Sequence, residues 1–530
     1  MLRRHSSVVW LVSLASFGCF AEGQAPKTAV VASPACTVEV PMRRLTPQQY
    51  THAIGDLFDG AVEPSARFPE QAGRSVTGFS TEPGLNGVDA LAAEQILLAA
   101  EDVALQIPGV LDCDDEACAA RFLDRLTTRA FRRTPTEVEQ ANLRKVFADA
   151  RADEAAVDEA TAMTVAVILQ SPQFLYTIEA GASDTPVRAL TSNEIATRLA
   201  LLLWDSIPDD ALLAAAAEGR LESSEGVVAE ARRMLADPKA ERMSRRFFRE
   251  WMHVDELTAV SRDPARHDWY DAAFAASIGE SFDRFVHRAL TEGWTVEELL
   301  TASSAPVDEV LAEHYGVAAP SEPWSWVDVD PERAVGVMTQ PAVMASLAHY
   351  DESSYVRRGH FVVSGLLCRS LGDPPANATQ EVVQIESWLR PGASRRELSR
   401  AVQRRTECGS CHLTLDPPGL AFEHFDATGR WRDHDVYGNP IDASGEIGAL
   451  RLEFSGAREL MEGVADRFEA RECVDRQVFR YFASRMDEDA DRCVLDQMQS
   501  NDGSVRGGLM TLVGSDAFRY RRTGSAEGTP

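Results

Sequence analysis

The sequence predicts a mainly α-helical protein built of several modules. Helix-start signals recur along the chain, each with a Ser or Thr cap and a Gln or Glu near the third helical position. Alternating strand patterns are rare, and the turn residues 437–440 favour one small hairpin near residues 430–445. A chain of 530 residues with 45% hydrophobic content is large enough for about three or four domains with buried cores.

Four helix starts follow from these signals. At the first, Thr46 is the cap and Pro47 and Gln49 occupy the first and third helical positions. Leu45 and Tyr50 can then pack together as a hydrophobic staple. The same pattern predicts starts at Thr134-Pro135-Thr136-Glu137, Thr191-Ser192-Asn193-Glu194 and Ser394-Arg395-Arg396-Glu397, and residues 90–106, 138–150 and 227–251 have helix length with few breakers.

The charge balance narrows the classes of partner. Lys and Arg number 53 against 82 Asp and Glu, which gives a net charge of −29 with histidine neutral. A surface this negative repels phosphate backbones and anionic lipids, so we expect neither nucleic-acid binding nor electrostatic docking to a membrane. The redox partner is unknown, and the acidic surface favours a basic one.

The N-terminus is typical of an export signal. Arg3 and Arg4 form a basic region, and residues 8–20 form an apolar stretch that is too short to span a membrane. We therefore predict a signal segment at residues 1–25 and an exported protein, either in the periplasm or as an outer-membrane lipoprotein. Two processing routes stay open, lipid attachment at Cys19 or ordinary cleavage a few residues later, and such a lipid is the only membrane contact that we expect.

Cysteine usage predicts disulfides, because an oxidising compartment favours pairing. The chain has nine cysteines, and six remain after Cys19 and the two cysteines of the motif described next are set aside. Unpaired buried thiols are the alternative for each pair. The expected pairs are Cys113 with Cys118, which flank a short loop, Cys473 with Cys493, which lie on neighbouring helical segments, and by elimination Cys36 with Cys368.

One motif carries specific chemistry, the segment Cys408-Gly409-Ser410-Cys411-His412. Two cysteines three residues apart on one helical turn can form thioethers to the two vinyl groups of a haem, and the adjacent histidine then reaches the iron as proximal ligand. At this chain's frequencies of 9 cysteines and 11 histidines the pattern arises by chance about 0.003 times. The sequence therefore predicts one covalently bound haem c.

Three other interpretations of the motif stay open. A structural zinc ion would take Cys408 and Cys411 with His412, His424 or His434, although an adjacent cysteine and histidine rarely bind one tetrahedral ion. A thioredoxin-like redox pair would need the two cysteines at a helix start that follows a strand, whereas the preceding residues predict a helix. The third interpretation is a plain structural disulfide between the two cysteines.

The sequence leaves the sixth iron ligand open. Downstream methionines are common donors, so Met461, Met486, Met498 and Met510 are candidates, and His424 and His434 are others. The remaining expected surroundings of the haem are the aromatic walls Phe422, Phe425 and Trp431, a propionate partner among Arg404, Arg405 and Arg430, and a turn at Asp416-Pro417-Pro418-Gly419 that ends the attachment helix.

These features predict an exported single-haem c-type protein that transfers electrons. One alternative is a haem enzyme with an open sixth position and peroxidase-like chemistry. Another is a cell-envelope scaffold in which residues 40–320 bind other proteins and a haem or zinc site is secondary. Walker, HExxH, GxSxG and GxGxxG motifs are missing, so nucleotide hydrolysis, zinc proteolysis and typical esterase chemistry have no support.

Several segments have residue patterns that helix formation alone does not require. They are residues 43–46, 129–133, 171–176, 357–359, 408–412, 422–426, 429–432 and 515–522. Together they resemble a family of exported multidomain proteins, first described in planctomycetes and common in myxobacteria, that combine domains of unknown function with a cytochrome c-like motif. The resemblance covers nearly the whole mature chain. It implies haem binding, electron transfer and helical modules at residues 40–110, 111–185, 186–320, 330–435 with the haem motif, and 440–522.

The chain departs from that family in three places, one of which is a proline run after Cys368 that is reduced to Pro374-Pro375. It has Ser354-Tyr355-Val356 where many relatives have Ser-Pro before the basic pair and the glycine. It also lacks the separate N-terminal cytochrome domain of some relatives. We therefore expect a single haem motif and no relay of several haems within the chain.

Overall fold

The computed structural model describes residues 36–64, 68–69, 75–113, 115–179, 187–255, 257, 261–372, 378–405 and 407–522. Within them helices dominate and the strands form three two-stranded antiparallel sheets, which confirms the mainly α-helical class. None of the helices in this part of the chain is long and apolar enough to cross a lipid bilayer. The expected signal segment at residues 1–25 and Cys19 lie outside the described residues.

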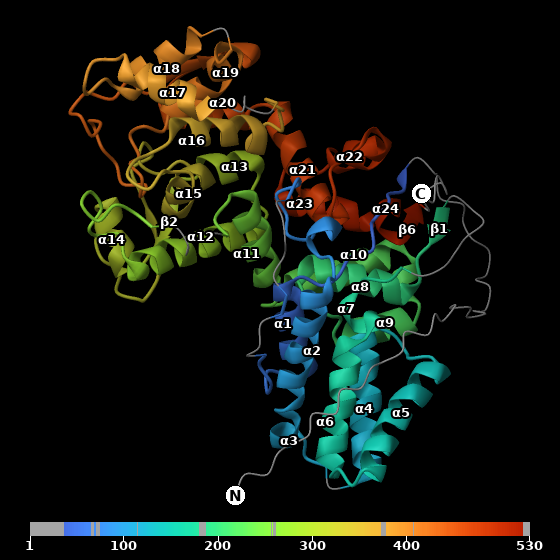
Figure 1. Ribbon diagram of the computed structural model, residues 1–530. Coiled ribbons are helices and arrows are strands. Elements are labelled where there is room, and N and C mark those ends of the chain that lie inside the picture. Colours follow the sequence, from blue (N-terminus) through green and yellow to red (C-terminus); the bar gives the residue numbers. More distant parts are fainter. Residues whose placement is uncertain are drawn as a thin grey trace, which may run out of the picture.

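The first third of the chain forms a helical bundle with its own core, drawn in blue to cyan in Figure 1. Leu123, Leu126 and Ala130 recur at helical spacing on one face of α4 and are buried in this core. Leu45 and Tyr50, the predicted staple, are fully buried in it too. The helices are α1 (Pro47–Leu57), η2 (Pro83–Leu85), α2 (Ala90–Ala104), α3 (Ile107–Val110), α4 (Glu116–Phe131), α5 (Glu137–Ala152), α6 (Val157–Gln170) and α7 (Pro172–Leu175).

A larger core joins the middle of the chain to its C-terminal part. Helix α10 packs on α23, α13 packs on α20, and strand β1 pairs with β6. The middle elements are β1 (Val187–Ala189), α8 (Ser192–Leu203), α9 (Asp210–Ala217), η3 (Arg220–Glu222), α10 (Ser224–Leu235), α11 (Ala240–Trp251), α12 (Ala272–Glu292), α13 (Val296–Thr301), β2 (Ser304–Val307), α14 (Glu309–Tyr315) and β3 (Ser325–Asp328). The C-terminal ones are β4 (Ser444–Ile447), η7 (Gly448–Leu450), β5 (Leu452–Ser455), α20 (Ala457–Ala465), α21 (Phe468–Ala483), η8 (Asp489–Asp491), α22 (Arg492–Met498), α23 (Val505–Gly514), α24 (Asp516–Arg519) and β6 (Tyr520–Arg522).

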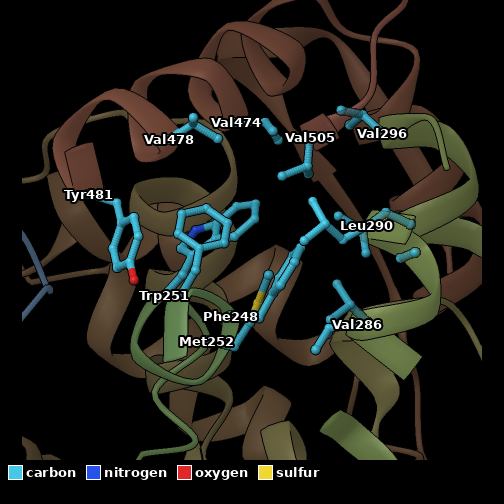
Figure 2. Close-up of a cluster of buried hydrophobic side chains, with 14 of the residues drawn as sticks. Phe248, Trp251, Met252, Val286, Leu290, Val296, Val474, Val478, Tyr481 and Val505 are labelled. Carbon is cyan, nitrogen blue, oxygen red and sulfur yellow. The ribbon is translucent and has the colours of Figure 1, made fainter. Parts of the chain in front are cut away.

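Figure 2 shows how side chains from distant parts of the sequence fill this core. Phe248 and Trp251 of α11 lie among Leu290 of α12, Val478 of α21 and Val505 of α23. All five side chains are buried. Burial of each large apolar side chain contributes about 1.5–3 kcal/mol, so these contacts hold the two parts of the chain together as one unit.

The predicted haem-binding segment forms the upper lobe of Figure 1 together with neighbouring helices. A small separate core of Ile385, Leu398 and Val402 lies beside Cys408. The elements are η5 (Val337–Thr339), α15 (Pro341–Ser346), α16 (Tyr355–Phe361), a π-helical turn η6 (Val362–Leu366), α17 (Ala378–Ser387), α18 (Arg395–Gln403) and α19 (Gly409–Leu420).

Three of the four predicted helix starts are confirmed. The side chains of Thr46, Thr191 and Ser394 each accept a hydrogen bond from the backbone N–H of the third helical residue. The side-chain oxygen of that residue accepts one from the backbone N–H of the cap. The fourth start is wrong by two residues, because Thr136 and Glu139 close a complete capping box and α5 begins after Thr136.

Two other local predictions need correction. Residues 227–251 form two helices, because Pro238 lacks the N–H that a continuous helix would use. The hairpin expected near residues 430–445 is reduced to a single antiparallel bridge between His434 and Pro440. The Asp435 carboxylate accepts hydrogen bonds from the backbone of the enclosed turn, and such side-chain bonds replace a strand ladder.

All six cysteines expected to form disulfides do so, but two of the three pairings differ from the prediction. Cys113 pairs with Cys118 as expected. Cys36 pairs with Cys493, and Cys368 pairs with Cys473. The N-terminal segment runs beside the C-terminal strand, where Val38 bridges Arg521, so Cys36 meets α22 rather than Cys368. Elimination fails here because connectivity depends on the whole fold.

A buried carboxyl group on α21 makes stability depend on pH. Asp475 is 4% exposed and accepts a hydrogen bond from Asn501 Nδ2 at 3.2 Å. Burial, aided by the negative charge of Glu472, raises the pKa of Asp475 to about 7. The unfolded chain releases this proton near pH 4, so the group stabilises the fold below that pH and the contribution is lost as pH rises toward 7.

We therefore expect Asp475→Asn to be more stable than the native chain above pH 7 and to show a flatter profile between about pH 4 and 7. The free energy of unfolding, measured by urea titration across this range, checks the prediction. The native slope attributable to Asp475 should approach about 1.4 kcal/mol per pH unit at most. Parallel profiles for the two proteins would contradict it.

Candidate haem attachment site

Helix α19 presents the cysteine–histidine motif on its first turn. Cys408 is the residue at its N-terminal boundary, and the backbone N–H of His412 donates to the Cys408 carbonyl at 3.1 Å. Both Cys408 and Cys411 are partly exposed, and neither is in a disulfide, whereas the other six described cysteines are all paired. The thiol of Cys411 donates to the carbonyl of Leu371 at 3.5 Å. Neither thiol is therefore consumed by a disulfide.

The ring of His412 is held by a buried carboxylate. Nδ1 of His412 lies 2.8 Å from Oδ1 of Asp416, which is four residues further along α19 and fully buried. Ser399 of α18 donates to the other carboxylate oxygen at 2.7 Å. Gln403 donates to Ser399 Oγ at 3.0 Å and to the His412 carbonyl at 3.3 Å. When Nδ1 carries the proton, Nε2 keeps its lone pair and is the ring atom suited to bind a metal.

Sequence reasoning missed the role of Asp416. The structure corrects the expected turn at residues 416–419, because α19 continues through Pro417 and Pro418 to Leu420. Helix α16 crosses α19 at this point: the carbonyl of Leu415 and the backbone of Gly419 lie against Gly359. Tight packing on α16 holds the proline-containing turn helical, which places Asp416 beneath His412. The i, i+4 spacing of a histidine and an aspartate is the sequence signal for this contact.

The expected haem walls belong to other parts of the fold. Phe422 and Phe425 are buried in the large core. Trp431 stacks on His424 with ring centroids 4.5 Å apart, and Nδ1 of His424 lies 2.8 Å from the Arg432 carbonyl. The guanidinium of Arg430 lies over Trp269 of the middle part of the chain. These aromatic residues build the loop after α19, and the structure does not gather them into an open pocket.

Arg358, one of the residues on which the family resemblance rests, is structural. Its side chain is fully buried and donates to the carbonyls of Phe422, Phe425 and Asp426. Burial lowers the pKa of Arg358 to about 10. Because one guanidinium satisfies three carbonyls of the loop after α19, it fixes the C-terminal end of the motif helix.

Three of the four methionine candidates belong to the large core or pack against it. Met461 and Met498 are fully buried in the large core, and Met510 packs against that core. Met486 is 38% exposed and follows Arg485, which is bound to Asp491 in the C-terminal part of the chain. The described residues contain no group of three or more His, Cys, Asp or Glu side chains that could hold a metal ion.

Four family models match consecutive parts of the chain. Each describes a protein of unknown function: PSD3 (DUF1587) at residues 43–107, PSD5 (DUF1595) at 118–179, PSD4 (DUF1592) at 190–317 and PSCyt3 (DUF1588) at 334–435. The chain is a planctomycete-type multidomain protein of unknown function. Its PSCyt3 domain contains the whole of α16, α18 and α19 and therefore the cysteine–histidine motif. No curated protein and no solved structure matches the chain significantly.

Proposed function

We propose that this chain carries one covalently attached haem c and transfers electrons in the cell envelope. Cys408 and Cys411 would form the thioethers and His412 would be the proximal iron ligand. One observation carries the proposal: these are the two described cysteines outside disulfides in a chain whose other six described cysteines are all paired. In an oxidising compartment such a spared pair, with a histidine at the next position, is best explained by attachment of a haem.

The donor set of the motif fits a haem. Asp416 holds Nδ1 of His412, and a metal-binding histidine almost always gives its other ring nitrogen to such a partner. Ser399 in turn satisfies the second oxygen of the carboxylate. A bound haem would supply one-electron redox chemistry, while the residues of α18 and α19 would fix the orientation and basicity of the imidazole.

Export is the second part of the proposal. Disulfides persist in oxidising compartments, and the pairing of Cys36 with Cys493 links the two ends of the described chain. This supports the signal segment proposed at residues 1–25 and a location in the periplasm or, with a lipid on Cys19, at the outer membrane. Mass analysis of the mature N-terminus distinguishes the two locations.

A haemochrome spectrum tests the cofactor. The full chain, produced in a host with cytochrome c maturation, should give a c-type pyridine haemochrome band that survives denaturation. Cys408→Ala with Cys411→Ala should abolish the covalent band. Cys113→Ala with Cys118→Ala removes two disulfide cysteines elsewhere and should keep it. Absence of haem from the native chain in a competent host would refute the proposal, and zinc analysis would then test the alternative site.

A second candidate function is a haem enzyme with an open sixth position. The contact between His412 and Asp416 favours it, because a carboxylate partner raises the basicity of the ligand and so favours peroxide chemistry at the iron. Met461 and Met498 are buried in the large core, which is the second reason. Carbon monoxide should shift the Soret band of the reduced protein if the position is open. A spectrum insensitive to carbon monoxide would assign the chain to electron transfer alone.

A further inference from the structure

A local excess of positive charge borders the motif. Residues 390–405 contain six arginines and one glutamate, a net charge of +5 in a chain whose net charge is −29. Arg396 and Arg400 lie four residues apart on α18, and Arg404 caps its C-terminal end after the same interval, so the three share one face of that helix. The expectation of a basic partner rests on the charge of the whole chain, whereas this segment beside the motif has the opposite net charge. Three of its arginines form ion pairs, Arg390 with Glu397, Arg395 with Glu352 and Arg396 with Asp442.

Arg396 and Arg400 line a hollow between α18 and α19. We call it the α18–α19 groove and define it by Arg396, Arg400 and Gln403 on one wall and Leu413, Pro417 and Leu420 on the other. Leu413 is 58% exposed, so the apolar wall of the groove is open to solvent. In Figure 1 both helices lie at the outer edge of the upper lobe, where a partner can approach. Basic side chains beside an exposed apolar surface are typical of a protein docking surface.

We call Arg396, Arg400 and Arg404 the arginine stripe. Its charge is only partly neutralised within the chain. Arg396 forms an ion pair with Asp442 at 3.0 Å, and Glu446 adds one acidic group to the rim of the groove. Arg400 and Arg404 are exposed, and neither forms an ion pair with another described residue. Burial lowers the pKa of Arg396, and the nearby charge of Arg400 lowers it further, so the like charges stand close together. Arg400 and Arg404 of the stripe can therefore form ion pairs with an acidic ligand.

The groove lies on the side of α19 away from the second attachment cysteine. Leu413 follows Cys411 by two residues, which turns its side chain about 200° around the helix axis. Gln403, which lines the groove, donates to Ser399 Oγ and to the His412 carbonyl, and Ser399 donates to Asp416. A partner in the groove would therefore be linked to the proximal histidine through a short series of hydrogen bonds.

We propose that the α18–α19 groove is the docking surface for an acidic redox protein that exchanges single electrons with the haem. This inference rests on the proposed function for the redox step, but docking itself needs only the surface. The acidic remainder of the chain repels such a partner elsewhere and so orients it toward the stripe.

Flavodoxin, a strongly acidic redox protein, is the probe. Its anionic flavin hydroquinone gives one electron to the ferric haem and becomes the neutral semiquinone, so no proton has to move. For the haem-loaded full chain, Arg400→Glu with Arg404→Glu should lower the association rate constant about tenfold or more at low salt. It should also flatten the dependence of that constant on ionic strength between about 10 and 200 mM. Stopped-flow electron transfer and surface plasmon resonance give independent readouts.

A matched control separates local from global charge. Arg121→Glu with Arg232→Glu makes the same change in net charge at exposed arginines on α4 and α10, and should change the rate about twofold at most. Equal effects of the two double variants would overturn the proposal. The proposal would also be overturned if a basic mitochondrial cytochrome c associated faster than flavodoxin and the groove variant left that rate unchanged. An altered haem spectrum in the groove variant would assign these arginines to the propionates and also overturn it.

A haem-free variant distinguishes failure of this inference from failure of the proposed function. Cys408→Ala with Cys411→Ala should still bind flavodoxin by surface plasmon resonance, with the same sensitivity to Arg400→Glu and Arg404→Glu. Loss of flavodoxin binding on removal of the two cysteines, with the fold intact by circular dichroism, would overturn docking on the groove. A native chain without haem refutes the electron-transfer function, while binding of flavodoxin to the groove would still support the docking surface.

Discussion

Gly359→Ala should destabilise the PSCyt3 domain by more than about 3 kcal/mol. A methyl group at position 359 would overlap the carbonyl oxygen of Leu415 and would lie 2.9 Å from the backbone nitrogen of Gly419. The crossing of α16 over α19 is equally close from the other side, because a methyl group at Gly419 would overlap the carbonyl oxygen of Tyr355. Both obstacles are backbone atoms, so no change of rotamer relieves the clash and the two helices must separate.

Thermal and urea unfolding of the full chain measure this effect, and Gly55→Ala is the matched control. Gly55 also lies inside an α-helix, but a methyl group there meets no atom within 4 Å. Alanine at position 55 should therefore be neutral or stabilise the fold by about 0.5–1 kcal/mol. Equal stability of the two variants would show that α16 and α19 do not depend on their close approach.

Local features of this chain were predictable, and long-range ones were not. The starts of α1, α8 and α18 depend on a cap and a residue three positions later, so a short window of sequence contains all the interacting atoms. The cysteine–histidine motif is likewise contained within one helical turn. The error at Thr134 also arises within a short window of sequence. Thr134 and Thr136 are competing caps, and Thr136 begins the helix because it forms a complete capping box.

The pairing of Cys36 with Cys493 depends instead on two segments 457 residues apart that meet only in the finished fold. The same limit applies to the site. The spacing of His412 and Asp416 is visible in the sequence, but the burial of Asp416 and its bond from Ser399 require α18 to pack on α19. Helix α16 also packs on α19, and this close crossing requires a glycine at position 359.

Asp416→Asn should raise the reduction potential of the proposed haem by about 60–120 mV. A carboxylate hydrogen-bonded to Nδ1 increases the electron donation of His412 and places a negative charge near the iron, and both effects stabilise the ferric state. Loss of such a partner typically weakens metal binding about tenfold to hundredfold. Where that loss falls on the ferric state, each tenfold corresponds to about 59 mV for one electron. The isosteric amide keeps the shape of the side chain, so the charge is the main change.

Spectroelectrochemical titration of the haem-loaded chain measures the shift, and Ser399→Ala provides a graded comparison. Removal of the Ser399 hydroxyl takes one hydrogen bond from the carboxylate but leaves its charge and its contact with His412. That change concentrates negative charge on the oxygen nearest His412, so the potential should fall slightly or stay constant rather than rise. Opposite or unequal responses of the two variants would assign Asp416 to tuning of the iron through its charge. A purely structural role predicts that both variants lower the melting temperature and leave the potential unchanged.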